Sequence, residues 1–560
     1  MQPTSEPTAD QVMIFTGATH FDGISLSDNG SGVVVRGDAI EAICGGSELA
    51  AYVDAGGEVV DLAGKTLMPG FVDAHAHPLL GGLERLRCDL TGGRTIADYG
   101  RLIAEYSARE PTVPWILGGG WGMDAFPGGR PTSAHLDAVE SGRPVYLPNR
   151  DHHSAWVNTK ALQLAGIDAR TPDPAGGRIE RDTSGEPTGL LHESAMHLVE
   201  HLTPVADQDD YDAALREAQR FMHSLGITGW QDAMVEVVAG KPSPHHSYLR
   251  AQQGGWLTAR VSAALWWDRS MTVAAVEAEV ARMVELRAQA RSSGDLYQAE
   301  MVKIMQDGVM ETYTAALLEP YLDACGCATP NSGMSFFDED VLRSSVLKLD
   351  AAGFGLHFHA LGDRAIRGVL DAIELAQATN GPNDRAHQLA HLQLVDPADI
   401  PRFEKLGAVA NLQPYWAKRA AQVDELTTPF LGTGRGARQY PFGDLYRSGA
   451  PLAMGSDWPV SSADPLDGVH VAVTRRAVGS AAGQAPLGVD QELDLSIALG
   501  AYTFGSSAAA GFPASGRLRV GAKADLAVLD RRLTDLPVDE IRSARVVNTY
   551  VGGALVYAES

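Results

Sequence analysis

The chain alternates short, continuously apolar runs with helix-like segments over most of its length, and this alternation restricts the fold more than any other feature. Apolar runs without polar alternation are typical of strands buried on both faces. A long succession of such strands and helices predicts a parallel sheet, either doubly wound or closed into an eight-stranded barrel. Clear runs are 66–72, 408–412 and 451–455, and clear helices are 211–224, 272–290 and 338–351.

The two ends of the chain have a different pattern, with short strand-like pieces separated by Gly, Asn and Asp turns. The strands are 12–16, 32–36, 39–43 and 59–62 at one end and 526–529, 546–550 and 554–557 at the other. Neither end has enough residues for a core of its own. We therefore expect one β-sandwich built from residues 1–68 and 506–560, around a barrel of residues 69–505 with a cap inserted near 115–225.

Composition excludes several classes of partner. The 560 residues hold 45 Lys and Arg against 70 Asp and Glu, a net charge of −25, which disfavours nucleic acid and anionic membranes. No run of about 18 apolar residues suggests a membrane span, and the first residues do not resemble a secretion signal. With only four cysteines, a reducing compartment is expected. These features predict a cytoplasmic protein with a small-molecule substrate, and we allow for a homodimer.

The strongest local motif is the segment 69–78, PGFVDAHAHP. Side chains at i and i+2 of a strand face the same way, so His75 and His77 point together. Two neutral imidazoles side by side are good ligands for a divalent metal. For an isolated pair, hydrogen-bonded core histidines would be the alternative.

The pair is not isolated, because three later strand-like runs also end on metal-ligand residues. One contains His357 and His359, the next ends at His391, and the last ends at Asp457. The carboxyl ends of all strands in a parallel barrel open onto one face, so these residues converge there. Such a set of nitrogen and oxygen donors suits Zn, Fe or Mn. Spacing alone leaves open whether His357 or His359 is the ligand.

With these motifs in place, the sequence resembles the amidohydrolase superfamily, and more narrowly the YtcJ-like branch that includes N-substituted formamide deformylase. The resemblance runs nearly from end to end and implies a TIM-like (β/α)8 barrel with a β-sandwich from both termini. The matching segments are 71–78, 151–158, 302–308, 357–365, 391, 455–460 and 516–526.

The resemblance implies a role for each matched position. His75 and His77 correspond to ligands of a first metal, and Lys303 to a lysine that CO₂ converts into a bridging carbamate. Lysine on an apolar strand is costly unless it is paired or modified. The alternative for Lys303 is a buried salt bridge with Asp307 or Glu311.

The resemblance further implies that His359 and His391 bind a second metal, and that Asp457 binds metal and shuttles a proton. It favours His359 over His357. One or two divalent ions, with zinc as the first choice, are therefore expected. The chain departs from the family at Ala390, where many relatives have a glutamate, so a role for that carboxylate is absent.

These residues predict a metal-dependent hydrolase of carbon–nitrogen bonds other than peptide bonds, acting on an amide or N-formyl group. A deaminase or metal-dependent decarboxylase on the same scaffold is the alternative enzyme. A regulatory homologue without catalysis is the alternative outside enzymes. As substrate contacts we expect Trp121, His153, Glu311 and Trp458.

Overall fold

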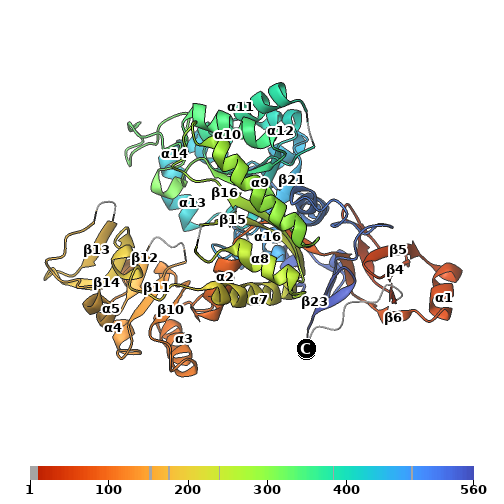
Figure 1. Cartoon of the computed structure of the whole chain (residues 1–560), viewed down its shortest axis with the longest axis horizontal. Coiled ribbons are helices and arrows are strands. Elements are labelled where there is room, and N and C mark those ends of the chain that lie inside the picture. Colours follow the sequence, from red (N-terminus) through yellow and green to blue (C-terminus); the bar gives the residue numbers. More distant parts are fainter. Residues whose placement is uncertain are drawn as a thin grey trace. The chain divides into compact units, whose positions relative to one another are not determined.

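The computed structural model describes residues 11–150, 154–174, 177–238, 240–382, 384–480 and 483–559 (Figure 1). The chain forms two compact units, one of Met1–His77 with Gln219–Ser560 and one of Pro78–Ala218. The first unit holds the barrel and the terminal sheets. In the described residues, no helix is long and apolar enough to cross a membrane.

The barrel is an eight-stranded sheet in which every hydrogen-bonded pair of neighbours is parallel. Its strands follow one another around the sheet in chain order, so the sheet is the predicted eight-stranded barrel and not the doubly wound alternative. Strands β8 and β18 are buried at every position, as expected where helices cover the outer face. In chain order the strands are β8 (Phe71–Ala76), β15 (Ile227–Val235), β16 (Arg260–Trp266), β17 (Tyr297–Met305), β18 (Gly355–Ala360), β19 (Gln388–His391), β20 (Val409–Leu412) and β21 (Leu452–Met454).

Helices alternate with these strands, as the sequence pattern predicts (Figure 1). The helix expected from residue 272 begins at Val276, because residues 272–275 form a turn in which the Ala275 amide donates to the Thr272 carbonyl. The principal helices are α7 (Gln208–Ser224), α8 (Pro244–Gln253), α9 (Val276–Ser293), α10 (Glu339–Ala351), α11 (Asp363–Asn380), α12 (Ile400–Leu406), α14 (Thr428–Gly436), α15 (Phe442–Arg447) and α16 (Pro465–Thr474).

The terminal segments form two sheets around a shared apolar core, with strands from both ends in one of them. Phe15 from the N-terminal part packs against Tyr550 from the C-terminal part, with ring centroids 5.2 Å apart. The six-stranded sheet has the order β24 (Ala554–Ala558), β23 (Val546–Val551), β22 (Leu526–Leu529), β7 (Thr66–Pro69), β2 (Thr19–Phe21) and β3 (Leu26–Ser27). The four-stranded sheet has the order β5 (Ala39–Cys44), β4 (Gly32–Arg36), β1 (Val12–Thr16) and β6 (Glu58–Asp61).

The apolar run 66–72 is not one strand, contrary to expectation. It divides at Gly70 into β7, which joins the terminal sheet, and β8, which joins the barrel. The Gly70 amide donates to the carbonyl of Asp525, whereas the next amide, of Phe71, donates to Gly226 in the barrel. A Cβ on Gly70 would lie 2.1 Å from the side chain of Thr228. Glycine at this position therefore lets the chain pass from one sheet to the other.

The second unit contains a six-stranded mixed sheet with two apolar clusters. We expected an inserted cap near 115–225, and this compact unit spans Pro78–Ala218. Its sheet order is β13 (Gly177–Arg181), β14 (Pro187–Glu193), β12 (Ser154–Val157), β11 (Val145–Pro148), β10 (Ile116–Gly119) and β9 (Cys88–Asp89). Its helices include α2 (Pro78–Leu86), α3 (Ile96–Arg109), α4 (Ser133–Asp137) and α5 (Thr159–Leu164).

Candidate metal centre

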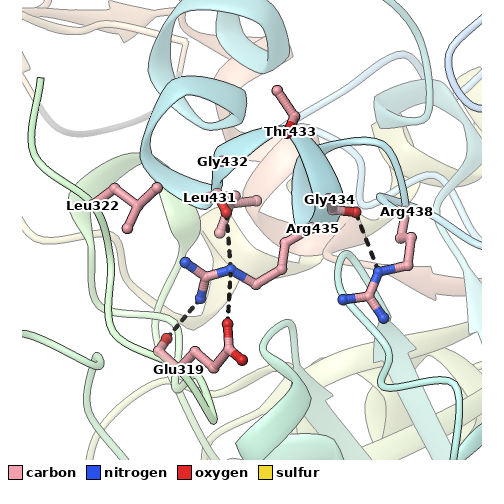
Figure 2. Close-up of a pocket in the computed structure, with 8 residues that line it drawn as sticks. All are labelled: Glu319, Leu322, Leu431, Gly432, Thr433, Gly434, Arg435 and Arg438. Atoms are coloured by element: carbon pink, nitrogen blue, oxygen red, sulfur yellow. Dashed lines mark hydrogen bonds and ion pairs between the residues drawn. The ribbon is translucent and has the colours of Figure 1, made fainter. Parts of the chain in front are cut away.

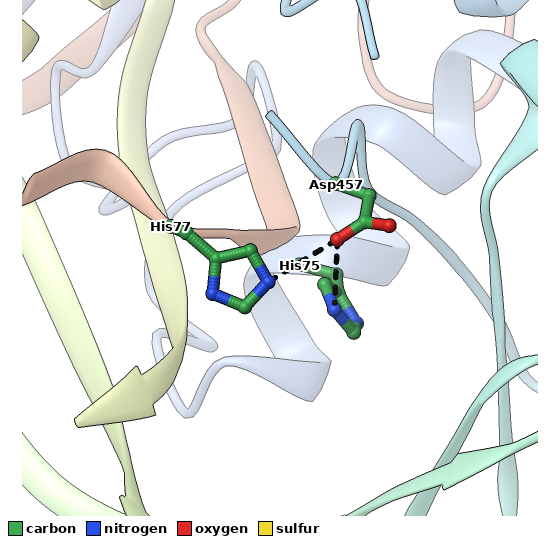
Figure 3. A group of neighbouring side chains, drawn as sticks. All are labelled: His75, His77 and Asp457. Atoms are coloured by element: carbon green, nitrogen blue, oxygen red, sulfur yellow. Dashed lines mark hydrogen bonds and ion pairs between the residues drawn. The ribbon is translucent and has the colours of Figure 1, made fainter. Parts of the chain in front are cut away.

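Three of the expected ligands meet at the carboxyl end of the barrel (Figure 3). His75 lies on β8, His77 follows that strand, and Asp457 follows β21. Oδ1 of Asp457 lies 3.2 Å from Nε2 of His77 and 3.4 Å from Nε2 of His75. One ligand atom from each of the three lies within 4.8 Å of the others. The HxH motif and the strand-terminal aspartate thus form one cluster, although 380 residues separate His77 from Asp457.

Backbone hydrogen bonds hold this cluster together at the seam between the first and last barrel strands. The Asp457 amide donates to the His75 carbonyl, and the His77 amide donates to the Trp458 carbonyl, both at 2.7 Å. Buried Asp73, on β8, accepts from the amide and the hydroxyl of Ser456 at 2.9 and 2.5 Å. Through these two hydrogen bonds, Asp73 stabilises the turn that contains Asp457.

The remaining expected ligands extend the cluster along the next barrel strands. The ring centroid of His391 lies 4.8 Å from that of His75 and 4.5 Å from that of His359. Lys303 on β17 is only 4% exposed. Asp307 accepts three backbone amides, and Glu311 accepts from Gln422 at 2.7 Å. Among the described residues Lys303 has no ion pair, so the salt-bridge alternative is not observed.

His357 and His359 lie on the same strand but have different surroundings. Nε2 of His357 lies 2.9 Å from Nδ1 of His75, and its Nδ1 faces the amides of Gln231 and Gln388. Both ring nitrogens of His357 are therefore engaged within the barrel. His359 instead has its Nδ1 3.4 Å from Asp307, without a hydrogen bond in the described structure. This geometry favours His359 as the ligand and makes His357 a support for His75.

A buried ladder of amide side chains, none of which is among the predicted site residues, contacts His357 and His391. The Gln388 amide donates to Gln231 at 2.9 Å, and Asn411 donates to Gln388 at 2.9 Å. Gln413 donates to Asn411 at 2.8 Å and accepts the backbone amide of His391 at 2.6 Å. The ladder satisfies polar groups inside the barrel and connects two of the histidine positions. A polar residue within an apolar strand was the available signal, at Gln388 and Asn411.

Burial controls the protonation of the cluster. It lowers the pKa of His359 to about 3 and holds those of His75 and His391 well below their usual range, so these rings are neutral near pH 7. Burial also lowers the pKa of Lys303 to about 7. For Asp457 burial acts upward, but the contact with His77 and nearby positive charge bring its pKa below the usual value.

These donors fit a divalent cation. Neutral imidazole nitrogens and an ionised carboxylate are ligands of Zn²⁺ and similar ions. A cation among these groups would neutralise the carboxylate and accept the lone pairs of the imidazole nitrogens. Orientation of His75 by His357 is the kind of outer contact that metal-bound histidines commonly have.

The expected substrate contacts have varied surroundings. Trp458 is 6% exposed and packs against Phe221, with ring centroids 5.2 Å apart. Glu311 is partly buried beyond the end of β17. Trp121 is fully buried in the apolar core of the second unit, where its Nε1 donates to the Leu147 carbonyl at 2.8 Å, an enclosure that favours a structural role. His153 lies outside the described residues.

A pocket of about 400 Å³ opens elsewhere on the barrel unit (Figure 2). Its buried guanidinium, from Arg435, donates to the carbonyls of Leu431, Glu319 and Pro320 at 2.7–2.9 Å. That donor set is occupied by the chain itself, so this side chain holds the local structure together.

Comparison with known proteins identifies the family. Residues 58–557 match the model of the amidohydrolase family. The chain belongs to this family. The amidohydrolase is 30% identical over 505 residues to the putative amidohydrolase YtcJ of Bacillus subtilis strain 168, covering 90% of this chain and 91% of that protein.

Further relatives cover the amidohydrolase almost completely. N-substituted formamide deformylase of Arthrobacter pascens is 28% identical over 541 residues, 94% of each chain. Protein LONG AFTER FAR-RED 3 of Arabidopsis thaliana is 30% identical, covering 97% of this chain and 91% of its own. The crystal structure of an uncharacterized metal-dependent hydrolase from Pyrococcus horikoshii OT3 superposes with a TM-score of 0.72 at 25% identity, covering 94% and 99% of the two chains.

Proposed function

We propose that this amidohydrolase is a metal-dependent hydrolase that cleaves the carbon–nitrogen bond of an amide or N-formyl group in a small molecule. The observation that carries the proposal is the convergence of His75, His77 and Asp457 at the carboxyl end of the barrel. In barrels of this kind the strand ends are where catalytic residues gather. The relative named as a formamide deformylase and the structural relative named as a metal-dependent hydrolase support the same chemistry.

A divalent ion at this cluster would supply Lewis acidity to the substrate carbonyl and lower the pKa of water toward neutrality. Asp457 accepts a proton from the attacking water as the new carbon–oxygen bond forms. It then returns this proton to the leaving nitrogen as the carbon–nitrogen bond breaks, so that amine and carboxylic acid are released. His75 and His77 would hold the ion next to Asp457, whose Oδ1 lies 3.4 and 3.2 Å from Nε2 of the two rings.

Lys303 is proposed to react with CO₂ to give a carbamate, releasing one proton. The reaction needs the neutral amine, and burial, which brings the pKa of Lys303 to about 7, supplies it near neutral pH. A carbamate would add an anionic oxygen donor to the set of predicted ligands, because Lys303 lies close enough to His75, His359 and His391 to influence their pKa values. We expect two zinc ions per chain in this state and one in its absence.

The test is a screen of N-formyl and N-acetyl derivatives of amines with metal-replete protein. Release of formate or acetate together with the free amine supports the proposal. Ammonia as the product would indicate a deaminase, and CO₂ a decarboxylase. Failure to bind a stoichiometric amount of zinc, iron or manganese would contradict the proposal of a metal-dependent hydrolase and favour a regulatory homologue.

A further inference from the structure

Arg269 occupies an unusual position near the carboxyl end of the barrel. It follows β16 in the turn at residues 268–271, and its residue surface is exposed. Its guanidinium carbon lies 4.3 Å from the ring centroid of Phe336 and 5.8 Å from that of Trp266. The head group also contacts the sulfur of Met305. These apolar contacts hold the cation in one place.

No acidic side chain neutralises this cation in the described residues. Asp268, its neighbour in sequence, is turned toward Ser270, accepting the amide at 2.7 Å and the hydroxyl at 2.6 Å. Within the described part of the chain, partial burial is the influence found on the pKa of Arg269, and it lowers that pKa. By contrast, the pKa of Arg260, on β16 itself, is raised, because the charge and the hydrogen bonds of Asp525 together outweigh the opposing effect of burial. The planar fork of Arg269 therefore has unused donors.

Arg269 contacts the strand neighbours of two of the predicted metal ligands. Trp266 and Met305, which its head group touches, are the register partners of Lys303 and His359 in the barrel sheet. Paired residues on neighbouring strands are about 5 Å apart. The positive charge of Arg269 also lowers the pKa of His359. A small molecule with one group bound to Arg269 would therefore have its scissile bond within reach of the predicted metal ligands.

We propose that Arg269 binds a carboxylate of the substrate, and that the substrate class is N-acyl or N-formyl amino acids rather than uncharged amides. The inference rests on the proposed hydrolase function. A guanidinium stacked on aromatic rings offers two parallel donors that match a carboxylate. In a chain of net charge −25, a local cation of this kind is what an anionic substrate requires.

Matched substrates test the inference. N-formylphenylalanine and N-formylphenethylamine differ only in the carboxylate, and N-acetyl versions provide a second pair. We expect the native enzyme to prefer the carboxylate member by about 10- to 100-fold in kcat/KM, the range for a charge-assisted contact. Arg269→Gln should remove this preference through KM, with kcat little changed. The loss of kcat/KM in Arg269→Gln should be larger for the carboxylate member of each pair than for the uncharged member.

Two control variants locate the effect. Arg269→Lys keeps the charge but not the fork and should restore part of the preference. Arg519→Gln removes an exposed arginine of the terminal segment and should leave kcat/KM for both members of each pair unchanged. Turnover without a carboxylate preference, or equal loss on both substrates in Arg269→Gln, overturns the inference and leaves the hydrolase proposal intact. Turnover of no substrate in either pair or in the wider screen overturns both.

Discussion

Nε2 of His357 lies 2.9 Å from Nδ1 of His75, and both rings are buried inside the barrel. This contact leaves Nε2 of His75 facing Asp457. In the proposed metal centre, His357 would therefore act through His75, whose ring it orients.

Replacing His357 with leucine should weaken zinc binding by about 10- to 100-fold, since His75 loses the partner that orients it. Competition with a chromogenic chelator measures the affinity. His245→Leu is the matched control, because His245 is equally buried but bonds to Tyr297 on the barrel wall. Equal affinity of the native protein and both variants would show that His357 has no positioning role.

Asp457→Asn should leave metal bound while lowering kcat by about 10²- to 10⁴-fold, because an amide keeps one oxygen near His75 and His77 but cannot carry the proton. Metal content is measured by plasma mass spectrometry on the same preparation used for kinetics. A variant that is fully metallated and active would exclude Asp457 as the proton carrier.

Lys303→Met should stabilise the metal-free protein, most strongly at low pH. Burial lowers the pKa of Lys303 from its ordinary 10.5 to about 7, so the unfolded chain binds the proton more tightly than the folded one. The resulting cost, about 1.4 kcal/mol for each tenfold loss of proton affinity, is complete below pH 7 and fades as the pH rises toward 10.5. Urea unfolding at pH 6.5 and pH 10 measures the difference. A gain that does not change with pH would contradict a depressed pKa.

Asp525→Ala should lower the free energy of unfolding by about 3–5 kcal/mol, because it leaves the guanidinium of Arg260, whose side chain is only 12% exposed, without its ion-pair partner. Asp525 accepts from Arg260 at 2.6 Å and from Ser515 at 2.6 Å, connecting the barrel to the terminal sheet. Arg545→Ala, which removes an exposed ion pair to Asp530, serves as the comparison and should cost less than about 1 kcal/mol. Denaturant unfolding of the two variants, side by side, checks the contrast.

Strand-terminal residues were the part of the site that could be predicted from sequence. Strand periodicity puts His75 and His77 on one face, and a parallel barrel brings Asp457 to the same end. Both inferences depend only on local pattern and on the direction of strands. The split at Gly70 could not be predicted, because it depends on Thr228 lying against that glycine in the folded chain.

The spacing of residues along the chain could not predict contacts between side chains on different strands. His357 and His359 are equivalent by periodicity, and they differ only because His75 and Gln231 surround the first of them. Trp121 is likewise an aromatic residue in a glycine-rich segment by sequence, and its burial depends on the packing of the second unit. Such distinctions arise from tertiary contacts, which the periodicity of a single sequence does not reveal.

The seam between β8 and the turn after β21 has a consequence for the order of events during synthesis. A ribosome that has made residues 1–440 has released the HxH motif and the His359–His391 pair, but has not yet made Asp457 or the backbone groups that bond to His75 and His77. The growing chain therefore carries an incomplete set of ligands for most of its translation. In the proposed metal centre, full metal affinity would arise only when the turn after β21 brings Asp457 to His75 and His77, so cation uptake would report that the last barrel strand is in place.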